Sequence, residues 1–350
     1  MNGWYVSETG DQEYYGADGL QCLGKTQIGD TFYYFNLETG IKETGFINNC
    51  YYDNDGKIYY GQKLIDGHWY YFSPSDGHMW IGFATIPKEY NKEGEKTAYY
   101  DSNGWIVNGL HKIGDYYYYF DMADGCMLTG FQVVSAKANN GIEKVAYFES
   151  NGRMFIGSKN VGKATIKTDS TGTIISTTIH GLPYYAQNDP RWAYTVIGGY
   201  FFSGTGCAPT VITSIVNYYL NTNLTPYQIG SELHRLGYFN TDGLAGTSSD
   251  CWNWVSNNYG FNIKNNLGFN DIINALKIGK LVAGAVGPGT FVNPGYTHEI
   301  LLSGINELGQ TYVYDPLHSG RNDWYYISDI WNQRSTAWED NLNGGPFYAM

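Results

Sequence analysis

Residues 204–220 read GTGCAPTVITSIVNYYL, and this stretch decides the fold of the second half of the chain. Its apolar side chains recur at the spacing of a helix, at Val211, Ile212, Ile215 and Tyr219. Cys207 stands where this predicted helix begins, because the glycines before it allow a tight turn and Pro209 suits a first turn that needs no backbone N–H. Unpaired N–H groups and the dipole at a helix N-terminus stabilise a thiolate. We therefore predict that Cys207 is a nucleophile, with a buried structural cysteine as the alternative.

A hairpin farther along the chain supplies partners for this cysteine. Residues 298–305 (HEILLSGI) predict a strand, NELGQ a turn, and residues 311–316 (TYVYDP) the second strand. The turn leaves His298 and Asp315 at the open ends of adjacent strands, where the carboxylate can orient the imidazole. A nucleophilic cysteine needs a histidine to move its proton and a third group to fix the histidine tautomer. Each residue alone is more often structural, so the prediction rests on their combination with Cys207.

Residues 181–350 resemble the papain-like cysteine peptidases related to the bacteriocin-leader-processing type. The resemblance rests on LPYYAQNDPRW at 182–192, on GTGCAPT, and on the pair HEILLSGI and VYDP. It implies an α+β domain in which Cys207 is the nucleophile, His298 the base and Asp315 the orienting residue. It also implies that Gln187 contributes to an oxyanion hole. A side-chain amide N–H suits that role beside the backbone N–H of Cys207, and an ordinary loop amide is the alternative.

Other residues compete for these roles. Glu299 follows His298 where the family often has an aromatic or aliphatic residue, so its carboxylate either raises the pKa of His298 or points to the opposite strand face. Cys251 is a rival thiol, although no glycine turn precedes it, and His318 is a rival base. Five cysteines without a CxxC pair, and histidines without metal-ligand spacing, argue against a zinc site or a complete disulfide framework. We expect neither a metal nor a cofactor.

The first half of the chain repeats two interleaved motifs. The first motif has glycines five and ten residues after Tyr14, Tyr51, Tyr99 and Tyr147. The second has glycines seven and twelve residues after Tyr33, Tyr70 and Tyr118, with a phenylalanine directly behind. An aromatic strand, a polar turn and a second strand form a β-hairpin, and single hairpins are marginal in water. The sequence therefore predicts an all-β hairpin-repeat solenoid ahead of the α+β domain.

These repeats resemble the cell-wall-binding repeats of Gram-positive surface proteins, related to choline-binding and glucan-binding modules, over about residues 3–160. Most of their aromatic rings are expected to form an interlocking core. Rings that remain exposed are expected to bind quaternary ammonium groups or to stack on sugars. The candidate ligand-binding residues are Phe46, Trp69, Trp80, Phe83, Tyr117 and Phe131. Choline-binding repeats carry Gly-Trp where this chain has Gly-Phe, so the ligand stays open between choline-decorated teichoic acid and a glycan.

The composition limits the classes of partner that the protein can bind and indicates where its domains begin and end. The chain has 350 residues and a net charge of -12, with no run of Lys and Arg, which argues against nucleic acid. The sequence contains no uninterrupted stretch of 18 apolar residues, so we predict no membrane span. The first residues lack the pattern of a signal peptide. Residues 162–180 contain no aromatic residue. We therefore predict a repeat array at 1–161, a linker at 162–180 and a peptidase domain at 181–350.

Together these observations predict a secreted hydrolase, attached non-covalently to the bacterial cell wall, that cleaves a peptide or amide bond through a cysteine thiolate. Its substrate is expected to be a peptide or a peptidoglycan stem. One alternative is a peptidoglycan amidase or endopeptidase, and another is a non-catalytic adhesin with a degenerate peptidase domain. Acyl transfer to an amine stays open, because it shares the thioester intermediate with hydrolysis.

Overall fold

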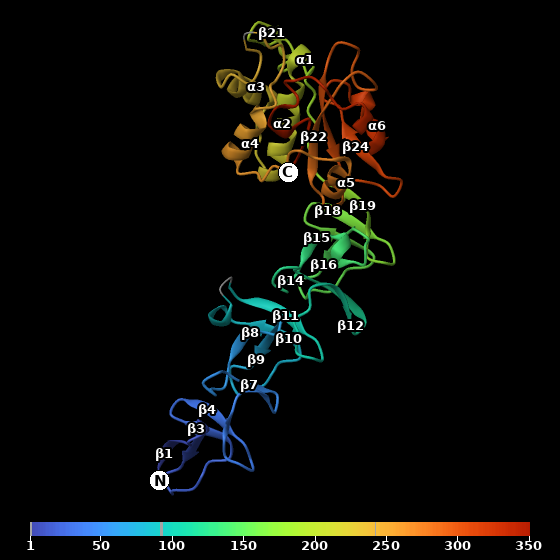
Figure 1. Ribbon diagram of the computed structural model, residues 1–350. Coiled ribbons are helices and arrows are strands. Elements are labelled where there is room, and N and C mark those ends of the chain that lie inside the picture. Colours follow the sequence, from blue (N-terminus) through green and yellow to red (C-terminus); the bar gives the residue numbers. More distant parts are fainter. Residues whose placement is uncertain (1, 92–93, 242) are drawn as a thin grey trace. The chain divides into compact units, whose positions relative to one another are not determined.

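The structure is a computed structural model that describes residues 2–91, 94–241 and 243–350 (Figure 1). Two units are distinguished by their internal contacts. The first comprises Met1–Thr129, Val134–Ile142 and Ser150–Arg153. The second comprises Gly130–Val133, Glu143–Glu149 and Met154–Met350.

The first unit is built from small antiparallel hairpin sheets. Its two-stranded sheets are β1 (Gly3–Val6) with β2 (Gln12–Tyr15), β6 (Gly45–Ile47) with β7 (Cys50–Tyr52), β8 (Gly61–Ile65) with β9 (His68–Phe72), and β10 (Gly82–Ile86) with β11 (Lys96–Tyr100). Its three-stranded sheets are β3 (Gly24–Ile28), β4 (Thr31–Phe35) and β5 (Lys42–Glu43), and β12 (Gly109–Ile113), β13 (Tyr116–Phe120) and β14 (Met127–Leu128). Short 3₁₀ helices occupy Lys88–Tyr90 and Ala136–Ala138. The predicted hairpin-repeat solenoid is confirmed.

Successive hairpins are joined by backbone hydrogen bonds and interlocking rings. The N–H of Ile106 donates to the carbonyl of Trp69 at 2.9 Å, which links two sheets of the repeat. The repeat glycines permit close approach: Gly104 has a φ of +78°, and a Cβ there would collide with the side chain of Met79. Phe72 is fully buried, and four rings lie 5.9–6.1 Å from it: Phe46, Tyr51, Tyr59 and Tyr70. The aromatic core is thus shared between neighbouring repeats.

Removing one of these shared rings is expected to destabilise the first unit. Phe72→Ala should lower its free energy of unfolding by about 3–5 kcal/mol, because it leaves a cavity among the surrounding rings. Leu64→Ala in the adjacent strand is the control, since Leu64 is 53% exposed and should cost about 0.5 kcal/mol or less. Urea denaturation followed by near-ultraviolet circular dichroism measures both values. Equal effects of the two changes would contradict the interlocking core.

The second unit begins with strands where the sequence predicted a linker. Residues 162–180 hold β18 (Ala164–Thr168) and β19 (Ile174–Ile179), which form a sheet with β17 (Ser158–Val161). Ile166 and Ile174 are fully buried against Val145 of β16 (Lys144–Phe148), which pairs with β15 (Gly130–Val134). Alternating β-branched side chains therefore form a strand here without the aromatic code of the repeats. The domain limits 1–161 and 181–350 stay a prediction.

The rest of the second unit is an α+β domain around a five-stranded antiparallel sheet, as predicted. The strand order is β25 (Asp323–Tyr326), β24 (Gln310–Tyr314), β23 (His298–Ser303), β22 (Leu281–Val286) and β26 (Phe347–Ala349). The helices are α1 (Phe202–Thr205), α2 (Cys207–Leu220), α3 (Pro226–Arg235), α4 (Cys251–Tyr259), α5 (Phe269–Lys277) and α6 (Ile327–Asn332). Smaller elements are β20 (Val196–Ile197), β21 (Tyr200–Phe201) and 3₁₀ helices at Ser319–Arg321 and Leu342–Gly344.

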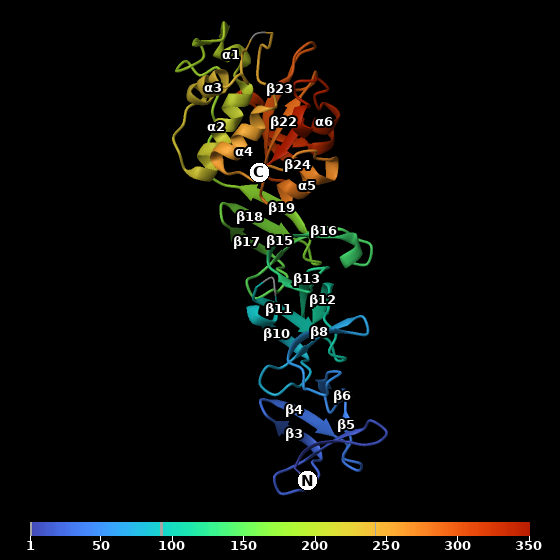
Figure 2. The same cartoon turned by 60° about the vertical axis from the view of Figure 1, so that its left-hand side comes forward.

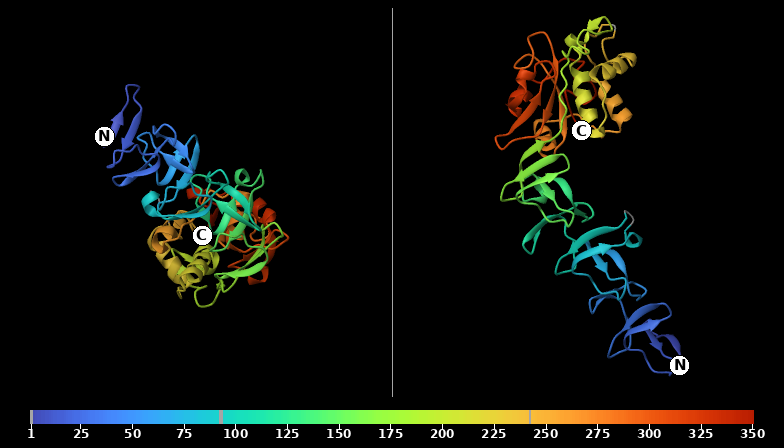
Figure 3. Two further views of the ribbon diagram at one scale, coloured as in Figure 1. Left: turned by 90° about the horizontal axis from the view of Figure 1, so that it is seen from below. Right: turned by 180° about the vertical axis from the view of Figure 1, so that it is seen from behind.

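Helices cover both faces of this sheet. Figures 1 and 2 place α2, α3 and α4 on one side and α6 on the other. In the view from behind in Figure 3, the yellow helices and the red segments again lie on opposite sides of the domain. Along β22, Leu281 and Ala283 pack with the α2–α4 cluster, whereas Val282 and Val286 pack with α5 and α6. This alternation explains why β22 and β23 are buried at every position.

The predicted hairpin at the sheet centre is present. Strands β23 and β24 are antiparallel, with Leu301 opposite Tyr314 and Ser303 opposite Tyr312. His298 is the first residue of β23, and Asp315 directly follows β24. Their side chains therefore meet at one edge of the sheet, as the position of the turn predicted.

Candidate active site

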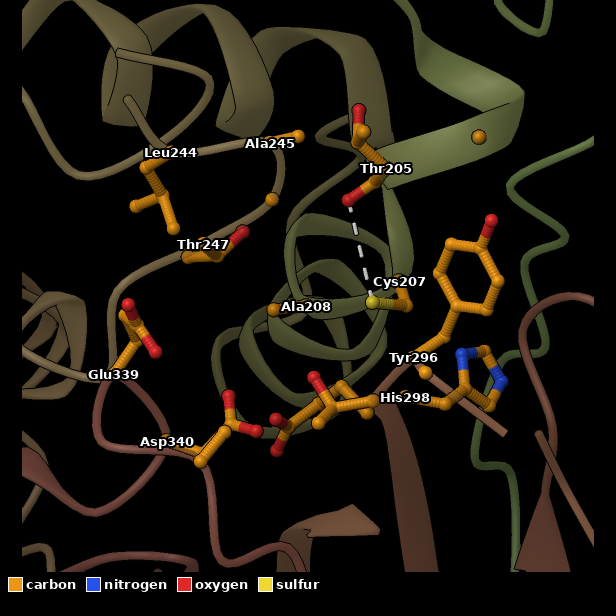
Figure 4. A pocket seen from close by; sticks show the side chains of 16 residues that line it. Thr205, Cys207, Ala208, Leu244, Ala245, Thr247, Tyr296, His298, Glu339 and Asp340 are labelled. Carbon is orange, nitrogen blue, oxygen red and sulfur yellow. Dashed lines mark hydrogen bonds between the residues drawn. The ribbon is translucent and has the colours of Figure 1, made fainter. Parts of the chain in front are cut away.

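Cys207 is the first residue of α2, as its sequence context predicted. The helix is fixed against the core by Val211, Ile212 and Ile215, all of which are buried. Cys207 itself is a free, half-buried cysteine that lines a cavity, and its Sγ lies 4.0 Å from the carbonyl oxygen of Thr205 (Figure 4). The first-turn N–H groups of α2 therefore lie next to a thiol that a substrate can reach.

His298 and Asp315 form a buried hydrogen-bonded pair. The Nε2 atom of His298 lies 2.8 Å from Oδ1 of Asp315. The same oxygen accepts the backbone N–H groups of Leu317 at 2.8 Å and His318 at 3.1 Å, while Oδ2 lies 3.6 Å from Nη1 of Arg321. These contacts hold the Asp315 carboxylate in position independently of its bond to the imidazole. With Nε2 engaged, Nδ1 is the nitrogen of His298 left for proton transfer.

The two partners shift each other's ionisation. Burial alone would lower the pKa of His298, but the hydrogen bond to Asp315 and the interactions with Cys207 raise it to about 9. Burial would raise the pKa of Asp315, but the bond to His298 and the N–H groups of Leu317 and His318 lower it. His298 therefore carries a proton near neutral pH, and Asp315 is a carboxylate.

Gln187 lies in the same cavity region as Cys207 and His298. It is buried, its backbone N–H donates to the carbonyl of Pro316 at 2.7 Å, and its Nε2 donates to the carbonyl of Ser203 at 2.7 Å. The bond to Ser203 uses one of the two N–H groups of Nε2, and the side-chain Oε1 is buried without a hydrogen-bond partner among the described residues. The structure therefore brings together all four residues that the sequence selected.

The rival residues lie in different environments. Cys251 is fully buried, and its pKa is raised well above the usual value by burial, which suppresses its thiolate. His318 is exposed at the cavity rim, and the Asp315 carboxylate bonds the His318 backbone rather than its ring. Glu299 is buried, and burial raises its pKa well above the usual value. The groups that raise the pKa of His298 are Asp315 and Cys207.

Two cavities meet at the cysteine and histidine. One of about 320 Å³ extends toward Thr247 and Asp340, and one of about 220 Å³ extends toward Gln187 and Arg321. Both are lined by Cys207 and His298. A chain lying across this junction would present one bond to the thiol and place its two sides in different pockets. The arrangement suits nucleophilic attack on a carbonyl carbon.

The candidate aromatic residues of the repeats are mostly exposed. Those between 39% and 45% exposed are Phe46, Trp69, Trp80, Phe83 and Tyr117. Phe131 is instead half-buried and packs on the cluster that contains Val145 and Ile166. The role of all six rings in ligand binding stays a prediction, and Phe131 is the least exposed of them.

Ring clusters recur at the Gly-aromatic pairs. Phe46 lies 5.1 Å from Tyr51 and from Tyr70, and Phe83 lies 4.9 Å from Tyr99 and 5.0 Å from Tyr118. Trp4, which the sequence reasoning missed, makes the same kind of cluster at 5.2 Å from Tyr14 and 5.0 Å from Tyr33. The pair Gly3-Trp4 is the signal that would have identified it.

Lysine side chains of the protein lie over several of these rings. Nζ of Lys63 lies 5.4 Å from the ring centre of Tyr51, and Nζ of Lys42 lies 5.8 Å from that of Trp4. An ammonium group at this distance is attracted by the ring face. These rings thus already contact ammonium groups of the protein itself.

The described residues contain neither an evident metal cluster nor a spanning helix. No group of three or more His, Cys, Asp or Glu side chains among them is placed to hold a metal ion. None of the helices within residues 2–91, 94–241 and 243–350 is long and apolar enough to cross a membrane.

Comparison with known proteins finds one family model and several similar structures. Residues 179–343 match the model of the Peptidase_C39 like family. No curated protein matches the chain. Among solved structures, CbpJ from Streptococcus pneumoniae is similar at 22% identity, over 50% of this chain and 58% of that one, with a TM-score of 0.42. The C-terminal region thus has the sequence pattern of a C39-like peptidase domain.

Two further pneumococcal structures are similar over half of this chain. Choline-binding protein F matches at 25% identity, over 50% of this chain and 57% of that one, with a TM-score of 0.40. The choline-binding domain of CbpL matches at 19% identity, over 50% of this chain and 86% of that one, with a TM-score of 0.38. This chain therefore spans 58% of the length of CbpJ and 57% of that of choline-binding protein F.

Proposed function

We propose that the C-terminal domain, whose sequence matches a C39-like peptidase model, is a cysteine peptidase that cleaves a peptide or amide bond through Cys207. The observation that supports this most is the placement of Cys207 at a helix start beside His298, whose Nε2 is held 2.8 Å from Asp315. Such a pair supplies a nucleophile, a proton carrier and an orienting carboxylate within one cavity.

In the proposed reaction, Cys207 gives its proton to His298, and the Sγ of Cys207 attacks the carbonyl carbon, which forms a C–S bond and moves one C=O electron pair onto the oxygen. The negatively charged oxygen of the tetrahedral intermediate accepts hydrogen bonds from the backbone N–H of Cys207 and from the side-chain amide of Gln187. His298 gives its proton to the leaving amine as the C–N bond breaks, which leaves a thioester on Cys207. Water then attacks the thioester, His298 takes its proton, and the thiolate leaves. Asp315 keeps the ring oriented throughout and stabilises its positive charge.

We further propose that the repeat array holds the enzyme on a polymer of the bacterial cell wall, outside the cell. The exposed rings of Trp4, Phe46 and Phe83 supply flat apolar faces that suit sugars. Lys42 and Lys63 already lie over rings that a quaternary ammonium group would use, which favours a glycan over choline. Tethering would raise the local concentration of wall substrates.

The test of this function is a comparison of substrates with product analysis. Purified peptidoglycan and denatured wall proteins are incubated with the full chain, and new amino termini are identified by mass spectrometry. Stem-peptide products would indicate a peptidoglycan endopeptidase or amidase, and protein fragments a protein peptidase. Added amine that appears in the products would indicate acyl transfer. Absence of any product from both substrates would support the non-catalytic adhesin instead.

Loss of the Gln187 side-chain amide should reduce turnover while the Cys207 thiol stays able to react. Gln187→Ala is expected to lower kcat by about 10²-fold, because one oxyanion donor is removed. Asn188→Ala is the matched control, since Asn188 is an exposed neighbouring amide whose Nδ2 donates to Leu317. Steady-state kinetics on the best substrate measure both. An equal loss in both variants would exclude the oxyanion role.

The pH profile should report the protonation of His298. Since its pKa is raised to about 9, activity is expected to fall as pH rises through that value and the imidazolium loses its proton. Asp315→Asn removes the negative charge that stabilises the imidazolium, so the alkaline limb should move to lower pH. Measurement of kcat/KM against pH tests this shift. An unmoved limb would show that Asp315 does not control the charge of His298.

A further inference from the structure

The larger of the two cavities is bordered by three carboxyl groups, and we call it the acidic pocket after Glu299, Glu339 and Asp340. Glu299 belongs to β23, directly after His298, whereas the other two residues precede the 3₁₀ helix at Leu342–Gly344. Figure 4 shows Glu339 and Asp340 beside the cavity that contains Cys207. No Lys or Arg occurs among the described residues that line it. Among the described lining residues, the pocket thus combines three carboxyl groups with His298 as its one basic group.

Glu299 is the group in this pocket that lacks a partner. Its side chain is 8% exposed, and its Oε1 has no hydrogen-bond partner within the described part of the chain. Burial, followed by the nearby Cys207 and Asp340, raises its pKa well above the usual value. A buried carboxyl without a partner is costly. A cation bound in the cavity beside this carboxyl would offset part of that cost by its charge.

Two other residues add acceptor oxygens to the pocket. Oγ1 of Thr247 is buried and also lacks a partner among the described residues. Burial raises the pKa of Asp340, and the nearby charge of Glu339 raises it further. Hydrogen bonds from Ser335 and Thr297 lower this pKa, but by less. Crowded carboxyls raise each other's pKa because like charges repel. A bound ammonium group would offset that repulsion, lower the pKa of Glu299 and Asp340 again, and pair with both groups as carboxylates.

The shape and chemistry of the pocket favour an ammonium group over a metal ion. The carboxyls are not arranged to hold a metal, as judged over residues 2–91, 94–241 and 243–350. An ammonium group carries three N–H donors and no acceptor, so it complements Glu299, Asp340 and Thr247. Its hydrogen bonds to carboxylates are charge-assisted and stronger than neutral ones. A volume of about 320 Å³ is enough for an aminoalkyl side chain.

We propose that the acidic pocket is the subsite that selects a substrate carrying a primary ammonium group, such as a lysine or another diamino acid, next to the scissile bond. This inference rests on the proposed peptidase function, since Cys207 and His298 line the same cavity. The opposite cavity is lined by Arg321, so the two sides of the thiol differ in charge. This difference would orient a substrate across Cys207.

The first experiment measures selectivity during cleavage. Peptides that differ at one position, with lysine, norleucine or ε-acetyl-lysine, are compared by kcat/KM at each position around the cleaved bond. Lysine is expected to be preferred over norleucine by roughly tenfold or more at one position. Glu299→Gln should remove most of that ratio, because the amide cannot pair with an ammonium as a carboxylate does. Glu307→Gln, on the exposed β23–β24 turn, is the matched control that removes a carboxylate elsewhere.

The second experiment measures binding without any cleavage. Saturation-transfer NMR on the full chain compares n-pentylamine with 1-pentanol, which has the same chain length but no charge. The amine is expected to bind the wild type and the Glu307→Gln variant, and to lose most of its signal in Glu299→Gln. If Glu299→Gln does not fold, Asp340→Asn takes its place, because Asn can keep the hydrogen bond to Ser335.

The outcomes separate this inference from the function on which it rests. A wild type that cleaves peptides without preferring lysine, or that keeps the preference in Glu299→Gln, overturns the inference and leaves the peptidase intact. A wild type that cleaves nothing contradicts the peptidase, and the NMR comparison then decides the pocket alone. Equal binding of n-pentylamine and 1-pentanol, or amine binding unaffected by Glu299→Gln, overturns the ammonium subsite.

Discussion

Cys207→Ala is expected to lower kcat by on the order of 10⁶-fold, to the rate of the background reaction. The Sγ atom of Cys207 is the one that forms the thioester, and alanine offers no nucleophile at the start of α2. The substitution removes a half-buried side chain and leaves the helix core of Val211 and Ile215 intact. Folding should therefore survive while the chemistry is lost. Initial rates on the substrate found by product analysis measure the effect.

The matched control for this change is Cys251→Ala. Cys251 is the fully buried first residue of α4, and its raised pKa disfavours a thiolate, so its loss should leave turnover close to the wild-type value. Thermal unfolding of both variants separates loss of chemistry from loss of fold. A Cys207→Ala protein that keeps its turnover, or a Cys251→Ala protein that loses it while folded, would assign the nucleophile to the wrong cysteine.

His298→Gln should have an effect of similar size. Glutamine keeps a polar group near Asp315 but cannot move a proton between the thiol and the leaving amine. Because the two residues act as a unit, the Cys207→Ala/His298→Gln double variant should be no slower than Cys207→Ala alone. His318→Gln is the comparison, since His318 lies at the rim of the same cavity and is exposed. It should lose far less activity.

Two results would contradict the assignment of His298 as the catalytic base. If His318→Gln were as damaging as His298→Gln, the base would be His318 and the 2.8 Å contact between His298 and Asp315 would be structural. Additive losses in the double variant would likewise show that Cys207 and His298 do not act in one step.

The sequence predicts the central site because each of its parts has a local signal. Glycines and a proline place Cys207 at a helix start, and the turn between β23 and β24 fixes how His298 and Asp315 meet. Both signals depend on backbone geometry over a few residues. The repeat units are predictable for the same reason, since their glycines and tyrosines keep one spacing.

The parts that the sequence misses depend on tertiary packing. Residues 162–180 form strands because Ile166 and Ile174 pack on β16, and the aromatic residues that mark the earlier repeat strands are absent there. Phe131 has the motif position of an exposed ring, yet the same cluster half-buries it. The fate of a side chain at a repeated position therefore depends on what covers its own unit.

The acidic pocket is a second feature that the sequence alone does not predict. Its carboxyls come from β23 and from the segment before Leu342–Gly344, which are far apart in the chain. In the sequence, Glu299 stands next to His298 and suggests an effect on the pKa of that histidine. In the structure, the carboxyl of Glu299 borders a cavity together with Cys207 and Asp340. Only the folded chain brings these groups together.

The most direct test of the account follows alkylation and hydrolysis in one sample. The full chain is treated with iodoacetamide for increasing times, modified cysteines are identified by peptide mass mapping, and residual hydrolysis is measured on the same aliquots. We predict that hydrolysis falls in proportion to the fraction of Cys207 that is alkylated and is independent of the other cysteines. Hydrolysis that persists after Cys207 is fully alkylated, or no hydrolysis before treatment, would contradict the account.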